Sequence, residues 1–297
     1  MERRRHELEG ASGGRLVVED AGPRDGAVLI FHGGTPGTGS IYEANLEAGA
    51  ARGVRHVSYA RPGYGGSDRH PGRTVGDCAA DVAAIADQLG IERFFTGGQS
   101  GGGPHALACA ALLSERVLAA FAVASYAPRG AESLDWLDGM AAECREEFAA
   151  AEAGERQLRD FLERLAPSLT GMDTGPPSDS LADLLGPVDR SLLNGDLSRH
   201  GATVMRAALE QGTWGWFDDD LALLADWGFD SESIQVPVAI WHGGDDRMVP
   251  FAHGRWLVEH VPGAAAHLFP EDGHLSFEVA RYGEILEDLH GAAARSG

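Results

Sequence analysis

The sequence predicts an α/β fold in which helices cover both faces of a mostly parallel sheet. Short apolar runs alternate with longer helix-forming segments along most of the 297 residues. Some runs, such as 27–31, are apolar throughout, as expected for a strand buried on both faces. Strands that alternate with helices in this way are typical of doubly wound sheets. The chain is long enough for one large core, or for a core domain that carries an insertion.

The expected elements follow from runs of apolar or β-branched residues and from the turn residues between them. Strands are expected at 14–22, 27–31, 54–59, 93–96, 117–126, 235–241 and 264–269. Helices are expected at 41–52, 75–89, 105–114, 252–259 and 277–293. The helix from Val75 has the clearest boundaries. Thr74 and Asp77 have the spacing of a capping box, and Gly90 suits the end of the helix.

The segment 131–229 differs in composition and in hydrophobic pattern from the rest of the chain. It is acidic, aromatic and prone to form helices, and it holds no convincing buried strand. The dipeptides Pro176-Pro177 and Gly186-Pro187 are expected to interrupt it. We therefore predict a core made of residues 1–130 and 230–297, with a helical insertion at 131–229.

The candidate nucleophile is Ser100, in the sequence Gly98-Gln99-Ser100-Gly101-Gly102. This G-x-S-x-G pattern stands between a predicted strand and a predicted helix. A serine on such a sharp turn exposes its hydroxyl, and the small neighbours avoid backbone clashes. The start of the following helix also supplies free backbone N–H groups for a developing oxyanion.

A nucleophilic serine needs a base, and the base needs an acid to orient it. His274 follows the last predicted strand, where a loop can bring an imidazole to the edge of the sheet. Asp245 and Asp246 follow the preceding strand, so the order is Ser, Asp, His. One aspartate should face the histidine, and the other should cap a turn or the next helix.

Four unusual loops follow predicted strands, at 32–37, 61–68, 98–102 and 242–250. In open α/β sheets, functional sites lie at the carboxyl ends of the strands. We therefore expect these loops to meet at one edge of the sheet.

In these motifs the chain resembles the α/β-hydrolase superfamily. The resemblance rests on His32-Gly33-Gly34, the loop Arg61–Asp68, the Ser100 turn, the run Gly243–Pro250 and Gly273-His274. It implies a sheet of about eight strands, and a helical cap at 131–229. It also implies that the triad acid is Asp246, which stands directly before the two residues that precede Val249-Pro250. Backbone N–H groups of Gly101 and of Gly34, or else Thr35, would form the oxyanion hole. His32 and His105 are expected to be structural.

The activity implied is that of a serine hydrolase acting on an ester, lactone or thioester of a small to medium apolar substrate. The candidate substrate-binding residues are Thr35, Gln99, Trp136, Trp214 and Trp216. A proline-iminopeptidase-like aminopeptidase is an alternative, which Thr35 before Pro36 and Gly101 after Ser100 weaken. A carbon–carbon bond hydrolase or a perhydrolase could use the same triad. A non-catalytic ligand-binding protein is the alternative from another class.

The composition excludes several other classes. A formal net charge of -21 disfavours nucleic acid as a partner. All 24 basic residues are arginine, which excludes chemistry that depends on lysine. Three scattered cysteines, Cys78, Cys109 and Cys144, predict neither a zinc site nor a disulfide framework. We expect no cofactor, no metal and no membrane partner. The absence of a signal-like or membrane-spanning segment favours a cytoplasmic protein.

Overall fold

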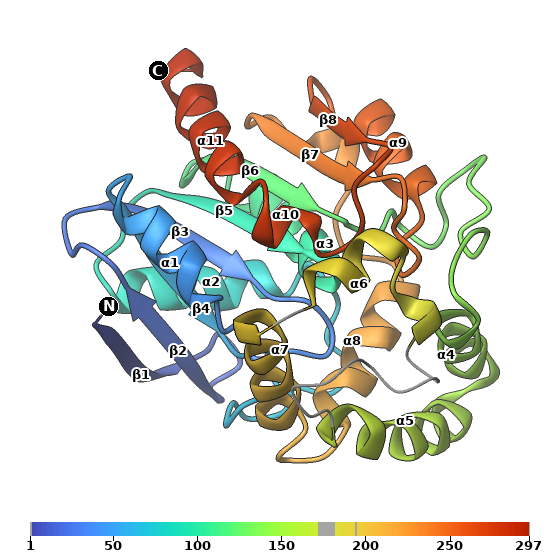
Figure 1. Ribbon diagram of the computed structural model, residues 1–297. Helices are drawn as coiled ribbons and strands as arrows, with labels where there is room; N and C mark the ends of the chain where they lie inside the picture. The colour runs from blue at the N-terminus through green and yellow to red at the C-terminus, as the bar shows by residue number, and fades with distance from the viewer. Residues whose placement is uncertain (1, 172–181, 194, 297) are drawn as a thin grey trace.

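The computed structural model describes residues 2–171, 182–193 and 195–296, and its centre is a mixed sheet (Figure 1). The eight strands in the described residues have the order β1-β2-β4-β3-β5-β6-β7-β8. They are β1 (Arg3–Glu9), β2 (Arg15–Ala21), β3 (Ala27–His32), β4 (Val54–Tyr59), β5 (Phe94–Gln99), β6 (Val117–Val123), β7 (Val238–Gly243) and β8 (Ala265–Phe269). The pairs β1–β2 and β2–β4 are antiparallel, and all the others are parallel.

Helices cover both faces of the sheet, so the predicted doubly wound architecture is confirmed. Helices α2 (Cys78–Gln88), α3 (Gly103–Leu112) and α9 (Phe251–His260) share one core with the sheet, through residues such as Val82, Leu107 and Leu257. Helices α1 (Glu43–Ala50) and α11 (Tyr282–Ser296) cover the other face, where Ile285 and Leu286 are buried. The short helix α10 (Ser276–Val279) precedes α11.

Five further helices lie between β6 and β7 in the described part of the chain. They are α4 (Ala142–Ala153), α5 (Glu155–Thr170), α6 (Pro187–Leu192), α7 (Gly195–Ala208) and α8 (Trp214–Leu224), and we call them the cap helices. Figure 1 shows them gathered on one side of the sheet. Gly186-Pro187 interrupts the helical segment as predicted, since Gly186 is extended and Pro187 stands at the first position of α6. Pro176-Pro177 lies outside the described residues.

One local prediction is confirmed, and one strand was missed. Thr74 and Asp77 form the predicted capping box, since each backbone N–H donates to the other side chain at 2.7 and 3.3 Å. Strand β1 was not predicted. It consists almost entirely of charged residues, and it forms because its backbone pairs with β2 along its whole length. Such charged sequences suit the edge of a sheet.

The three cysteines are all buried and unpaired. None of the described helices combines the length and the apolar character that crossing a membrane requires.

Candidate active site

Ser100 occupies a sharp turn between β5 and α3. Its backbone φ is 55°, in the left-handed region that residues with a side chain rarely adopt. The flanking glycines make this turn possible. A Cβ on Gly98 would lie 2.1 Å from the carbonyl oxygen of Gly102, and a Cβ on Gly102 would lie 2.1 Å from that of His32. The G-x-S-x-G pattern is thus a steric requirement of this turn.

Asp246 and His274 form a buried pair at the ends of β7 and β8. The distance between His274 Nδ1 and Asp246 Oδ2 is 2.7 Å, and each residue is 4% exposed. Asp246 Oδ1 also accepts the backbone N–H groups of Met248 and Val249, both at 2.9 Å. These bonds fix the carboxylate toward the imidazole. Asp245, the other candidate acid, has no hydrogen bond to His274 in the described structure, and its buried Oδ2 has no hydrogen-bond partner there.

The charge of Asp246 controls the titration of His274. Burial by itself would lower the pKa of His274, but the attraction and hydrogen bond of Asp246 outweigh it and raise that pKa above its ordinary value. Gln99, next to Ser100, donates from Nε2 to the carbonyl oxygen of His274 at 3.3 Å. Among the described residues, no hydrogen bond joins Ser100 Oγ to the imidazole. In hydrolases this contact often tightens only when substrate binds.

Asp189 of α6 holds the loop that carries His274. Its two carboxylate oxygens accept the backbone N–H groups of His274 and Leu275, at 2.7 and 2.8 Å. Gly273 permits this approach, since a Cβ there would lie 2.4 Å from Asp189 Oδ1. The sequence analysis did not identify Asp189. Its partners lie 85 and 86 residues away, and no local pattern marks such a contact.

The loop after β3 lies against Ser100. A Cβ on Gly34 would lie 3.4 Å from Ser100 Cβ and 3.9 Å from Ser100 Oγ. A Cβ on Gly101 would lie 2.3 Å from Thr35 Oγ1. Gly34, Thr35 and Gly101 therefore border the nucleophile, as an oxyanion hole built from their backbone N–H groups requires.

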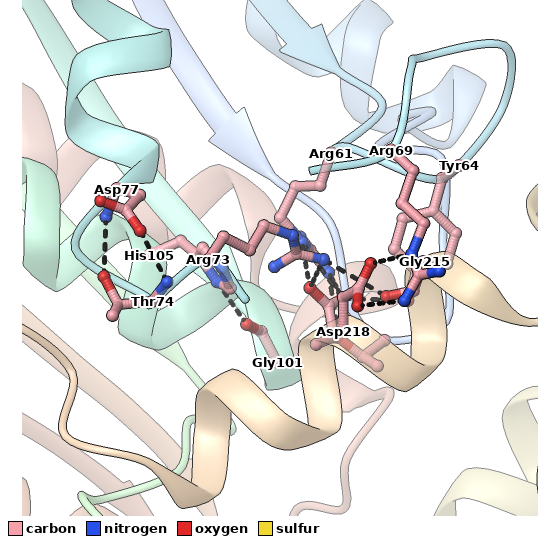
Figure 2. Close-up of polar contacts among 12 residues, drawn as sticks. Arg61, Tyr64, Arg69, Arg73, Thr74, Asp77, Gly101, His105, Gly215 and Asp218 are labelled. Atoms are coloured by element: carbon pink, nitrogen blue, oxygen red, sulfur yellow. Dashed lines mark hydrogen bonds and ion pairs between the residues drawn. The ribbon is translucent and has the colours of Figure 1, made fainter. Parts of the chain in front are cut away.

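A buried ion cluster fixes this loop to the cap helices. Arg61 donates to the carbonyl oxygens of Gly33 and Gly34 at 2.6 and 3.0 Å. The same guanidinium pairs with Asp219 of α8 at 2.6 Å, and Arg73 pairs with the other oxygen of Asp219 at 2.7 Å. Figure 2 shows Arg61 and Arg73 both pointing toward α8.

The Asp219 carboxylate accepts hydrogen bonds from two further side chains. Thr35 Oγ1 and the hydroxyl of Tyr64 also donate to Asp219 Oδ2, at 2.7 and 3.0 Å. Burial would raise the pKa of Asp219, but Arg61 and Arg73 hold it well below its usual range. The sequence predicted that the 61–68 loop lies at this edge, but it gave no signal for Asp219.

The two histidines that were expected to be structural are buried and neutral. His105 Nδ1 is 2.8 Å from the carbonyl oxygen of Gly101, a contact visible in Figure 2. His32 lies 3.3 Å from Thr96 Oγ1 and 3.4 Å from the Tyr59 hydroxyl. Burial lowers the pKa of His105 to about 3 and also lowers that of His32. Both rings are therefore only weakly basic, and His105 helps to orient the peptide of Gly101.

A cavity of about 280 Å³ opens between Ser100 and the cap helices. Most of its lining is apolar and comes from cap leucines, Phe148 and Tyr126, which suits a largely apolar ligand. Thr35 and Trp216, two of the candidate substrate-binding residues, line it. Groups of three or more side chains suited to a metal ion are absent from the described residues.

Three other candidate substrate-binding residues do not line this cavity. Trp136 is 2% exposed, stacks on Tyr126 and donates to the carbonyl oxygen of Ala127. Trp214 is 39% exposed and carries the guanidinium of Arg69 on its ring. Gln99 borders a smaller neighbouring pocket. Trp136 lies in the turns between β6 and α4, and Trp214 is the first residue of α8. The sequence around each tryptophan does not indicate which neighbours it packs against.

Comparison with known proteins gives a consistent result. A family model described as "alpha/beta hydrolase fold" matches residues 26–280. The chain is similar to a non-heme chloroperoxidase of Streptomyces lividans, with 29% identity over 253 residues that cover 82% of each chain. A 2-hydroxy-6-oxononadienedioate/2-hydroxy-6-oxononatrienedioate hydrolase of Paraburkholderia phymatum is 26% identical over 297 aligned residues, covering 96% of this chain and 93% of the relative. A bifunctional esterase/perhydrolase of Acinetobacter calcoaceticus is 25% identical over 238 residues, covering 80% of each.

Proposed function

Because the chain belongs to the alpha/beta hydrolase fold family, we propose that it is a serine hydrolase that cleaves carboxylic esters, lactones or thioesters of a small to medium, largely apolar substrate. Its nucleophile is Ser100, its base His274 and its orienting acid Asp246. The observation that carries this proposal is the buried His274–Asp246 pair, together with a serine that has a left-handed backbone conformation and lines an apolar cavity.

The mechanism follows from this arrangement. Ser100 Oγ attacks the substrate carbonyl carbon, and His274 accepts the hydroxyl proton. The carbonyl oxygen becomes an oxyanion that the backbone N–H groups of Gly101 and Gly34 stabilise, each worth about 3 kcal/mol. His274 then protonates the leaving alcohol, and an acyl-enzyme remains on Ser100. Water, deprotonated by His274, attacks this intermediate and releases the acid.

The alternatives differ in what the cavity must accept. The dioates named for the Paraburkholderia relative are dicarboxylates. The cavity described above has no arginine in its described lining, whereas it contains several carboxyl groups. This disfavours a dianionic substrate and supports hydrolysis of a neutral or cationic one. The similarity to the Acinetobacter esterase/perhydrolase supports ester hydrolysis and leaves perhydrolysis as a second activity to assay.

The test compares wild-type protein with Ser100→Ala on nitrophenyl esters, lactones and aminoacyl-naphthylamides. We expect ester hydrolysis by the wild type and a loss of at least about 10⁴-fold in Ser100→Ala. A fluorophosphonate probe should label Ser100 in the wild type only. Undiminished ester hydrolysis in Ser100→Ala would refute the proposal, and cleavage confined to the naphthylamides would favour a peptidase. A folded wild type that neither reacts with the probe nor turns over any substrate would indicate a binding protein.

A further inference from the structure

One end of the cavity carries three carboxyl groups from two cap helices. Glu143 and Glu147 stand one turn apart on α4, and Asp220 faces them from α8. Glu147 and Asp220 lie close enough for each carboxyl group to affect the pKa of the other. Trp216 Nε1 donates to Glu147 Oε1 at 2.6 Å and so fixes this side chain. These three carboxyls, which we call the acidic end, share the cavity with Ser100.

Within residues 2–171, 182–193 and 195–296, no arginine or histidine forms an ion pair with the acidic end. Asp220 is 1% exposed, and neither its Oδ2 nor the buried Oε2 of Glu143 receives a hydrogen bond from a donor in the described part of the chain. Exposed Arg164 acts on Glu143 only through its charge. The neighbouring residue Asp219 differs sharply, since it binds Arg61 and Arg73. Of these two consecutive aspartates on α8, Asp219 therefore binds two arginines and Asp220 forms no ion pair with a described residue.

A buried carboxyl without a partner costs free energy and therefore calls for an explanation, of which a bound cationic group is one. Burial raises the pKa of Glu147 to about 7 and that of Asp220 above its ordinary value. Each raised pKa means that ionisation of the group is costly without a positive charge beside it. The N–H groups of a cationic ligand would supply that charge.

We propose that the acidic end binds a protonated amine of the substrate, and thus that the enzyme prefers esters that carry an ammonium group at one end of an apolar chain. This inference rests on the proposed function for the identity of the scissile bond. An ammonium group has three N–H donors. The acceptors available to them are Asp220 Oδ2, Glu143 Oε2 and the carboxyl group of Glu147. Trp216, Tyr126 and Phe148 line the same cavity, and their rings can stabilise a nearby cation.

The experiment uses substrates that differ only at the terminal group. Ethyl 6-aminohexanoate, ethyl heptanoate and monoethyl pimelate end in ammonium, methyl and carboxylate on the same chain. A second series, 6-aminohexyl acetate and heptyl acetate, places the amine in the alcohol. We expect kcat/KM to be at least about tenfold higher for the amine than for its methyl analogue in one series, which corresponds to about 1.4 kcal/mol. Monoethyl pimelate should be the poorest substrate.

The variants Asp220→Asn and Glu147→Gln test the assignment of residues. Each should reduce the amine-to-methyl ratio of kcat/KM to within about twofold of unity. Glu146→Gln is the matched control, because Glu146 is exposed on the same helix and should leave the ratio unchanged. Circular dichroism verifies that each variant is folded. A ratio that persists in both folded variants would overturn the proposal.

A binding measurement separates this proposal from the proposed function. Calorimetry on Ser100→Ala compares hexylammonium with 1-hexanol and needs no turnover. Hexylammonium should bind at least about tenfold more tightly, and Asp220→Asn in the same background should remove the difference. If neutral esters are hydrolysed but neither amine preference is found, the amine site is wrong and the esterase stands. If hexylammonium binds as expected but no ester is cleaved, the amine site stands and the esterase is wrong.

Discussion

The protonation of His274 decides whether Ser100 can be activated. Burial alone would favour the neutral imidazole, but Asp246 at 2.7 Å raises the pKa of His274 above the ordinary 6.5. Only the neutral ring can accept the proton of Ser100. We therefore expect kcat/KM for a neutral ester to fall as the pH drops through this raised pKa. A pH–rate profile between about pH 5 and pH 9 measures the midpoint.

A second carboxyl near the triad needs a control in this experiment. Burial raises the pKa of Glu278 to about 7, and the charge of His274 acts on it. In Glu278→Gln the acidic limb should remain, since it belongs to His274. In Asp246→Asn the rate should fall about 10⁴-fold and the residual limb should move to lower pH. A wild-type midpoint at or below 6.5 would contradict the assignment, as would loss of the limb in Glu278→Gln.

At the level of elements, α6 determines where the His274 loop lies. Asp189→Ala would leave the backbone N–H groups of His274 and Leu275 without acceptors, at a cost of about 1–3 kcal/mol each if they stay buried. We expect a lower kcat with little change in KM for a neutral ester, because the imidazole is misplaced while the cavity persists. Asp189→Asn keeps one acceptor oxygen and should recover part of kcat. A purely structural role would lower the melting temperature of both variants without this graded effect on kcat.

Two neighbouring aspartates attach helix α8 to the core, and the arginines that they bind differ in burial. Asp219 is fully buried between Arg61 and Arg73, whereas Asp218 pairs with Arg69, whose side chain is 30% exposed. Asp219→Asn leaves two buried guanidinium groups without compensation. We expect it to lower the free energy of unfolding by about 3–5 kcal/mol.

Asp218→Asn is the matched control for this prediction. The exposure of Arg69 limits the loss to about 1 kcal/mol or less. Urea denaturation of both variants measures the difference. Asp219→Asn should also reduce kcat, since Arg61 holds the carbonyl oxygens of Gly33 and Gly34 beside Ser100. Equal destabilisation by the two variants would show that burial does not govern these pairs.

At the scale of the whole molecule, sequence reasoning succeeded where a contact is encoded locally. The G-x-S-x-G turn, the Thr74–Asp77 capping box and the apolar strands all follow from neighbouring residues. The meeting of the four loops follows from a general rule about parallel sheets. The positions of Trp136 and Trp214 depend on how the cap helices pack, and the roles of Asp189 and Asp219 depend on partners far along the chain. No local pattern specifies such contacts.

The net charge of the molecule should make its stability depend on salt. The chain has 45 acidic and 24 basic residues, so 45 − 24 = 21 acidic groups lack a cation even if every arginine is paired. Repulsion among these groups destabilises the compact state, and salt screens it over about 10 Å at 0.1 M. We expect the melting temperature to rise by about 3 °C, or roughly 1 kcal/mol, between about 10 and 150 mM NaCl. Sucrose at matched osmolality should have a smaller effect. The opposing term comes from surface pairs such as Arg15–Asp68, which salt weakens. A melting temperature that falls with salt would show that these pairs outweigh the repulsion.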